Sequence, residues 1–160
     1  MRALVITIRA LDTGLRIAAA LCLAGMFALM LAQVGLRYSP LGIPAFTEEL
    51  ARYAMVWMAL LATAVAVREG SHIRIDFIPA VLGVLAPPVA RGLEWLLDAV
   101  TLAVCLTILW QGLDIVSFAA GQRSDGLRIP MSWPYAMMPV AFGFASLFAL
   151  ARLLARERLA

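Results

Sequence analysis

Three features of the sequence predict an all-α integral membrane protein with four transmembrane helices. Of the 160 residues, 64% are hydrophobic and only 14% are charged, too few charges to cover the surface of a soluble domain. The apolar residues form four long runs that arginines flank. These runs are longer than strands and lack the alternation of a membrane-spanning strand. No internal repeat or linker interrupts the chain, so we expect a single domain over residues 1–160.

The uncharged runs place the spans along the chain. A spanning helix needs about 20 apolar residues, because the hydrocarbon core is about 30 Å thick and a helix rises about 1.5 Å per residue. We expect the four spans at residues 17–36, 47–67, 92–115 and 133–152. Thr47 is a candidate N-cap for the second span, and Pro134 suits the first turn of the fourth. Pro87 and Pro88 break the apolar stretch before the third span, which predicts a short interfacial helix over residues 80–86.

Arginine determines the expected orientation, because the chain has no lysine. With both termini inside, nine arginines fall on the cytoplasmic side and four on the outer side. Cytoplasmic loops carry the excess of positive charge, so we expect both termini to be cytoplasmic. A cleaved signal peptide would also begin with arginines and an apolar run. This run is too long for one, and no clear small-x-small cleavage site follows it.

Several kinds of site are excluded by the residue types present. His72 is the only histidine, which excludes bis-histidine haem ligation and a His-rich metal site. Cys22 and Cys105 carry no motif and fall inside spans, where we expect them to be packing residues. The chain has no P-loop and no basic patch with interleaved aromatic residues. We therefore expect no enzymatic activity, no cofactor, no metal, and neither a nucleotide nor a nucleic acid as partner.

The outer side carries two groups of charged residues. Glu48, Glu49 and Arg52 stand at the start of the second span, with Glu48 and Arg52 one helical turn apart in the favourable order. Acids at a helix start also suit the helix dipole, so these residues are either a capped helix start or a surface that a partner contacts. The outer loop adds a second group. The predicted partner-docking residues are Glu48, Glu49, Arg52, Arg123, Asp125 and Arg128.

The polar sequence REGSHIRID, residues 68–76, follows the second span and is the densest polar stretch in the chain. We expect it to be a structural loop on the cytoplasmic side, with His72 as an ordinary hydrogen-bonding residue. Its predicted structural residues are Arg68, Glu69, His72, Arg74 and Asp76.

Three acids belong to the third span: Glu94, Asp98 and Asp114. Acids in a membrane helix suggest a proton or sodium path. The central 15 residues hold none of them, however, which would leave a gap of about 20 Å in such a path. We favour pairing at the two membrane surfaces. Arg91 and Arg74 are the expected partners of Glu94 and Asp98 at one surface, and Arg123 and Arg128 those of Asp114 at the other.

A stripe of alanines at strict i, i+4 spacing marks the first span. Small residues on one face let membrane helices approach closely, which predicts packing within the chain or against a partner. The helix-interface candidates are Ala20, Ala24, Ala28 and Ala32, together with Trp57, Glu94 and Asp98.

Two segments resemble a known family. They are EELARYAMVWMALLATAVAVREGSHIRIDFI, residues 48–78, and GLRIPMSWPYAMMPVAFG, residues 126–143. Together they resemble the small membrane subunit of tripartite ATP-independent periplasmic (TRAP) transporters, the DctQ-like family. The acidic pair, Trp57 and the REGxHIRID loop carry most of the resemblance, followed by Ile129-Pro130, Trp133 and Pro139.

The resemblance implies a division of labour. In that family a large membrane subunit holds the substrate and sodium sites, and a periplasmic binding protein delivers the substrate. The small subunit braces the large one and helps to dock the binding protein. The expected partners are therefore the large TRAP membrane subunit, the periplasmic substrate-binding protein and the lipid bilayer, and the expected location is the bacterial inner membrane.

Two alternatives remain open at this stage. The small four-span subunit of a tripartite tricarboxylate transporter has a similar size, but we would not expect the REGSHIRID loop in it. A stand-alone small exporter would need a membrane-embedded acid near mid-depth, and the first span has none. The transported substrate does not follow from this chain, because the resemblance places specificity in other subunits.

Overall fold

The computed structural model describes residues 2–38, 45–69 and 87–157. Its elements are α1 (Arg2–Arg37), α2 (Ala45–Glu69), α4 (Pro87–Ala119), α5 (Ser132–Tyr135) and α6 (Met137–Glu157). Four of the described helical segments are long and apolar enough to cross a membrane, with α5 and α6 together forming the last. The described residues contain no strand, only an isolated bridge between Arg123 and Pro130. The predicted fold class, an all-α membrane protein with four spans, is confirmed.

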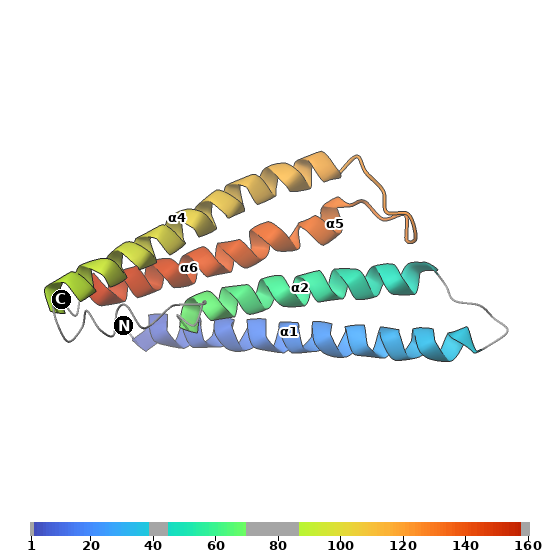
Figure 1. Ribbon diagram of the computed structural model, residues 1–160, viewed down its shortest axis with the longest axis horizontal. Helices are drawn as coiled ribbons and strands as arrows, with labels where there is room; N and C mark the ends of the chain where they lie inside the picture. The colour runs from blue at the N-terminus through green and yellow to red at the C-terminus, as the bar shows by residue number, and fades with distance from the viewer. Residues whose placement is uncertain (1, 39–44, 70–86, 158–160) are drawn as a thin grey trace.

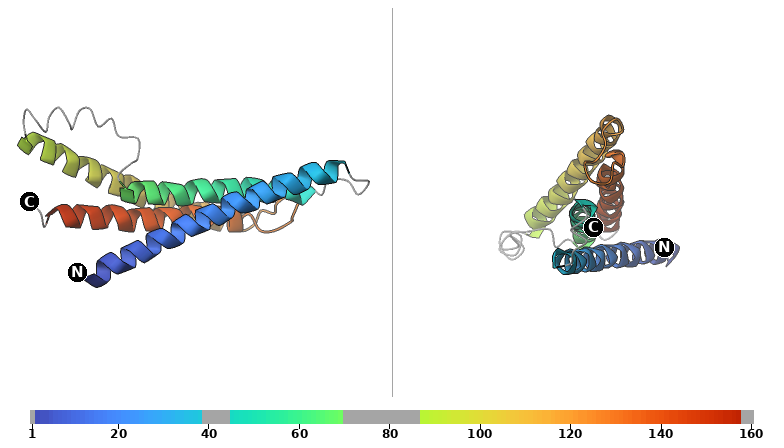
Figure 2. Two further views of the ribbon diagram at one scale, coloured as in Figure 1. Left: turned by 90° about the horizontal axis from the view of Figure 1, so that it is seen from below. Right: turned by 90° about the vertical axis from the view of Figure 1, so that its right-hand side faces the viewer.

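The helices stand in the order α1, α2, α6, α4, so the last span lies between the second and the third (Figure 1). Both ends of the chain lie at one end of the molecule, which we call the terminal end. The connection from α4 to α5, residues 120–131, lies at the opposite end, which we call the loop end. At the terminal end α1 and α4 diverge to opposite sides of α2 and α6 (Figure 2).

The core lies along α2 and α6, the two middle helices, with Leu15 of α1 on one side, and several of its residues are small. Ala64 of α2 and Ala145 and Ala149 of α6 are almost fully buried, with Phe148 beside them. Cys105 of α4 joins the same cluster, as predicted for a packing residue. Small side chains allow close approach of helices in a membrane, where lipid tails remove the hydrophobic drive for association.

The helices extend beyond the predicted spans. Helix α1 begins at Arg2, and α2 begins at Ala45, so Thr47 lies inside the first turn and the N-cap prediction for it was wrong. Pro87 and Pro88 open α4, because a first turn needs no amide hydrogen from them. The predicted interfacial helix over residues 80–86 lies outside the described residues.

A short interruption separates α5 from α6 at Ala136. Pro139 has no amide hydrogen for the carbonyl of Tyr135, four residues earlier, which weakens the helix here. Beside this interruption, the carbonyl oxygen of Pro134 accepts a hydrogen bond from the indole Nε1 of Trp57, at 3.2 Å. Trp57 therefore ties α2 to the start of the last span.

Candidate partner-docking groove

Glu49 holds the connection between α4 and α5 against the start of α2. Its Oε2 accepts hydrogen bonds from the backbone amides of Gly126, at 2.9 Å, and Leu127, at 3.0 Å. Its Oε1 accepts a bond from the hydroxyl of Tyr53, one helical turn further along α2. Because ionised acceptors make stronger hydrogen bonds than neutral ones, this carboxylate is an effective anchor for the loop.

The connection is a folded hairpin-like loop. The amide of Ser124 donates to the carbonyl of Ile129 at 2.9 Å, and the amide of Met131 donates to the carbonyl of Gln122 at 2.9 Å. Arg128 adopts a positive φ of 53°, a conformation that a non-glycine residue takes only in a constrained turn. The loop therefore presents its side chains from a defined backbone.

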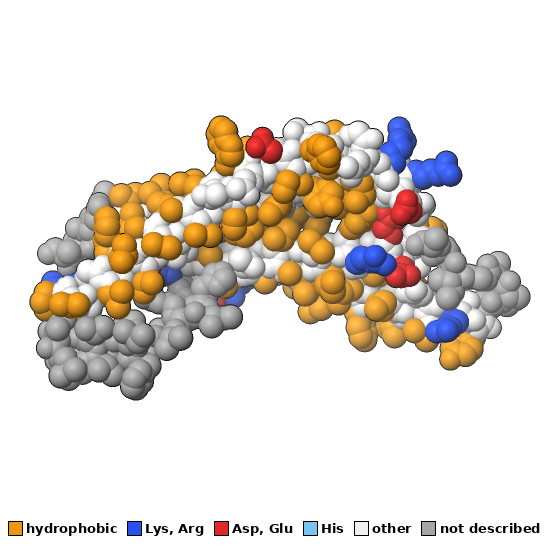
Figure 3. All heavy atoms as spheres, turned by 45° about the horizontal axis from the view of Figure 1, so that its top comes forward, with side chains coloured by type: hydrophobic (Ala, Val, Ile, Leu, Met, Phe, Trp, Pro, Cys, Tyr) orange, Lys and Arg blue, Asp and Glu red, His pale blue; other side chains and the backbone are white. Residues whose placement is uncertain are grey.

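A groove of about 520 Å³ opens between this loop and the first turns of α2. Its lining residues are Glu48, Glu49, Arg52, Tyr53, Gln122, Arg123, Ser124, Asp125, Gly126 and Met131. Five of the six predicted docking residues are among them, and Arg128 lies in the loop outside the lining. Figure 3 shows acidic and basic side chains gathered at this end, while hydrophobic side chains cover much of the rest of the visible face.

Both walls of the groove carry acidic and basic side chains. On the α2 wall Glu48 and Arg52 form the predicted ion pair, with 2.6 Å between Oε1 and Nη2, and about two thirds of each side chain is exposed. On the loop wall Arg123 donates to the carbonyl of Arg128 at 3.4 Å, and Asp125 is exposed. Within the described residues no three His, Cys, Asp or Glu side chains lie close enough to hold a metal ion. The arrangement can bind charged groups of a partner protein.

The terminal end holds an ion-pair network that the sequence analysis did not identify. Asp12 of α1 is buried, pairs with Arg16 at 3.0 Å and contacts Arg68 of α2, while Arg16 also pairs with Glu69. The network joins α1 to α2. The i, i+4 spacing of Asp12 and Arg16 could have indicated it, because such pairs share a helix face.

Arg68 and Glu69, predicted as loop residues, belong to the last turn of α2. The helix continues through them because arginine and glutamate are good helix formers and Arg68 favours a helix C-terminus. The other predicted residues of this loop, His72, Arg74 and Asp76, lie outside the described residues.

Asp98 is buried and pairs with Arg152 of α6, with 3.1 Å between Oδ1 and Nη2. Arg152 also donates to the carbonyl of Val67 at 3.0 Å, so it links α4, α6 and α2. From the sequence we expected Arg91 or Arg74 as the partner of Asp98, and Arg74 lies outside the described residues. Arg152 was not among the expected partners, because only the packing of α6 against α4 brings it to Asp98. Asp114 takes part in none of the ion pairs among the described residues, contrary to its expected pairing with Arg123 or Arg128.

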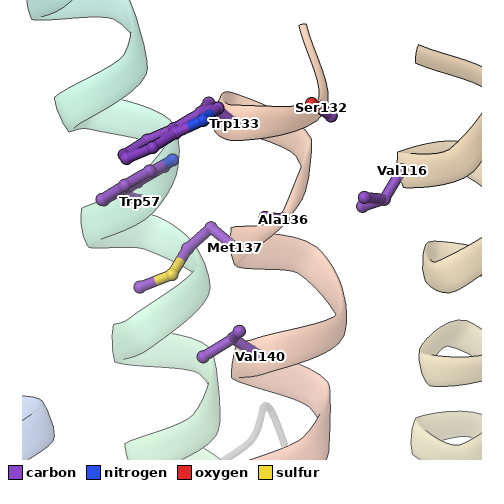
Figure 4. Close-up of a pocket in the computed structure, with 7 residues that line it drawn as sticks. All are labelled: Trp57, Val116, Ser132, Trp133, Ala136, Met137 and Val140. Atoms are coloured by element: carbon purple, nitrogen blue, oxygen red, sulfur yellow. The ribbon is translucent and has the colours of Figure 1, made fainter. Parts of the chain in front are cut away.

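The remaining helix-interface candidates have different surroundings. Trp57 is partly buried, and Figure 4 shows it beside Trp133 of α5, on an open apolar cavity of about 450 Å³. Glu94 is partly buried. All four alanines of the α1 stripe are exposed, on the side of α1 away from α2. They therefore do not pack within the described part of the chain.

The fold and the groove define a class: a small four-span membrane protein whose polar surface is suited to contacts with other proteins. Residues 26–159 match the family model described as "Tripartite ATP-independent periplasmic transporters, DctQ component". The chain is also 33% identical over 117 residues to the isethionate TRAP transporter permease protein DctMQ of Oleidesulfovibrio alaskensis. That match covers 71% of this chain and 18% of the relative, so the chain spans under a fifth of the relative's length.

This protein belongs to the DctQ family of TRAP transporter components, which confirms the resemblance. It is a multi-pass membrane protein, and its family implies a large membrane subunit as partner. The family is one of transporter components and not of enzymes.

Proposed function

We propose that this chain is the small permease subunit of a TRAP transporter that uses a sodium gradient to import an organic acid. Membership of the DctQ family over residues 26–159 is the observation that carries the proposal. The named relative is an isethionate transporter permease, and isethionate is a small organic anion. That name supports an organic anion as the cargo here, without identifying which one.

In this proposal the chain is a rigid structural support for the large membrane subunit. Asp98, a buried acid of the third span, is held by Arg152, which suits a rigid scaffold better than an ion path. The relative joins the Q component to an M component under the single name DctMQ. This supports a close and lasting association between the present chain and a large membrane subunit.

The second part of the proposal is that the groove at the loop end docks the periplasmic substrate-binding protein. Four charged side chains, Glu48, Arg52, Arg123 and Asp125, line it from two walls. Glu49 serves a different purpose, because its carboxylate is engaged by Tyr53 and by two loop amides. Glu49 therefore positions the loop, while the four other residues meet the partner.

This docking surface requires the loop end to face the periplasm. We infer that orientation from the sequence, because the expected topology assigns nine arginines to the side of the two termini and four to the other side. The protein then lies in the bacterial inner membrane with both termini in the cytoplasm.

Transport by reconstituted proteins tests the proposal. Liposomes are prepared with the large subunit, with this chain, and with both, and uptake of a panel of organic acids is measured with the binding protein and a sodium gradient. We expect uptake only when both membrane subunits and the binding protein are present, and none when the gradient is dissipated. Uptake by this chain alone, or full uptake without it, would refute the assignment.

A further inference from the structure

Helix α4 has one face packed against α6 and an opposite face that no other part of the described chain covers. The packed face repeats every seven residues as Cys105, Gly112 and Ala119, all buried. At Gly112 the two helices are so close that an added Cβ would lie 3.2 Å from Cδ of Pro139. The rotation of α4 about its axis is thereby determined, and so is the set of residues that points outward.

The outward face carries a mixed aromatic and polar stripe near the loop end. Trp110 is 73% exposed and Phe118 is 77% exposed, among the most exposed large apolar side chains described. Gln111 and Asp114 are exposed between them. The spacing i, i+1, i+4, i+8 keeps the four side chains on one side of the helix. We call these four residues the α4 stripe.

The position of the α4 stripe within the membrane indicates what its polar residues, Gln111 and Asp114, can contact. The charge-free run of α4, residues 99–113, has 15 residues. Such a run rises about 22 Å, less than the hydrocarbon core of about 30 Å. If the core is centred on that run, it covers roughly residues 97–116, so Asp98 and Asp114 lie just within its two edges and Gln111 lies deeper. Asp98 is buried and paired with Arg152. Asp114 is exposed, and no side-chain partner for it occurs among the described residues.

Acids and amides inside a membrane face a partner or a water-filled cavity and seldom face lipid tails. A lipid headgroup could reach Asp114, which lies five residues before the end of α4. Gln111 lies a further turn inside, about 12 Å from that end, where a spanning helix of a partner can offer a polar group more readily than a lipid headgroup can. Interhelical hydrogen bonds of this kind hold membrane helices together.

We propose that the α4 stripe docks the large membrane subunit, through a spanning helix that offers a cation or a hydrogen-bond donor to Asp114. The inference rests on the proposed function, since it names the surface for the partner proposed above. Trp110 and Phe118 supply the apolar contact on either side of the polar pair. The alanine stripe of α1, which is also uncovered in the described chain, carries no group that selects a partner.

Photo-crosslinking tests the contact in the assembled complex. Benzoylphenylalanine replaces Phe118 in one variant and Leu113 in another, and the complex is illuminated in membranes. Leu113 is also exposed on α4 but points about 140° away from Phe118 around the helix. We expect Phe118→benzoylphenylalanine to crosslink to the large subunit, and the Leu113 variant to give little of that product. Adducts with lipid alone, or with a second copy of this chain, would overturn the proposal.

A second measurement addresses Asp114 itself. Asp114→Ala should lower the affinity for the large subunit by roughly three- to thirtyfold, because an interhelical polar contact is lost. Arg37→Ala removes an exposed charge at the end of α1 and should leave the affinity unchanged. The melting temperature of the isolated chain should be the same for both variants, since the side chains of Asp114 and Arg37 make no hydrogen bond or ion pair in the described chain.

The two hypotheses fail in different ways. If the unsubstituted chain neither binds a large subunit nor is needed for uptake, the proposed function is wrong. If it binds and supports uptake, but Asp114→Ala binds as well as the unsubstituted chain, only the inference about the α4 stripe is wrong.

Discussion

Glu48 and Glu49 are neighbours in the sequence, yet they have different surroundings. Glu48 pairs with Arg52 on the exposed wall of the groove. Glu49 accepts bonds from Tyr53, Gly126 and Leu127, so it joins a helix to a loop. Consecutive residues of a helix point about 100° apart, which is enough to separate a surface charge from an anchor.

Removing the charge of Glu49 should loosen the loop. Glu49→Gln keeps the shape of the side chain but replaces a charged acceptor with a neutral one, and neutral acceptors make weaker bonds. We expect faster amide hydrogen exchange at Gly126 and Leu127, and weaker binding of the periplasmic partner. Glu48→Gln is the matched control and should leave exchange at both amides unchanged. Equal exchange in the two variants would show that Glu49 does not hold the loop.

At the scale of elements, the packing of α4 on α6 depends on Gly112. Any side chain there meets Cδ of Pro139 at 3.2 Å and its backbone nitrogen at 3.3 Å, and neither atom belongs to a flexible side chain that could move aside. Gly112→Ala should force the helices apart and lower the free energy of unfolding by about 1–3 kcal/mol. A thermal melt in detergent measures the change.

Gly92→Ala is the control for that substitution. Gly92 lies in the same helix with nothing within 4 Å of an added Cβ. Alanine there should stabilise the helix by about 0.5–1 kcal/mol through lower backbone entropy in the unfolded chain. If the two variants melt alike, the contact with Pro139 does not limit the packing.

Three spans meet at Arg152, which pairs with Asp98 of α4 and donates to the carbonyl of Val67 in α2. Arg152→Met keeps an apolar stem of similar length but removes the cation that pairs with the buried carboxylate of Asp98. Loss of one partner of a buried ion pair costs about 3–5 kcal/mol, and we expect the variant to melt correspondingly earlier. Arg91→Met, an exposed position on α4, should change stability by less than about 0.5 kcal/mol. Similar melting of both variants would argue against a structural role for the pair.

At the scale of the whole molecule, the proposed orientation can be tested by labelling. Asp125→Cys places a thiol at the loop end, and Ser71→Cys places one in the segment after α2. In intact cells a membrane-impermeant maleimide should label Asp125→Cys and leave Ser71→Cys unlabelled until the membrane is opened. The native thiols, Cys22 and Cys105, lie inside spans, and the unsubstituted chain serves as the control for them. The reverse pattern would show that the loop end faces the cytoplasm.

The sequence alone was sufficient for the class of fold and for the charged surface. Length and hydrophobicity of a run decide whether a helix can span a membrane, and both are local properties. The i, i+4 pair of Glu48 and Arg52 is local as well, and the structure contains it. The helix ends were harder to predict from the sequence. Helix α1 starts at Arg2 and α2 at Ala45, both earlier than the apolar runs suggest. A helix can continue past the apolar run wherever its backbone hydrogen bonds persist.

Only the tertiary structure decided which distant residues meet. The last span lies between the second and the third, and this order brings Arg152 to Asp98 and Trp57 to Pro134. The same order brings the loop between α4 and α5 to Glu49 and leaves Asp114 on a face of α4 that the described chain does not cover. Contacts of this kind depend on the order and rotation of packed helices, which several arrangements of the same four apolar segments would satisfy equally well. Close packing at small residues such as Gly112 selects one of them.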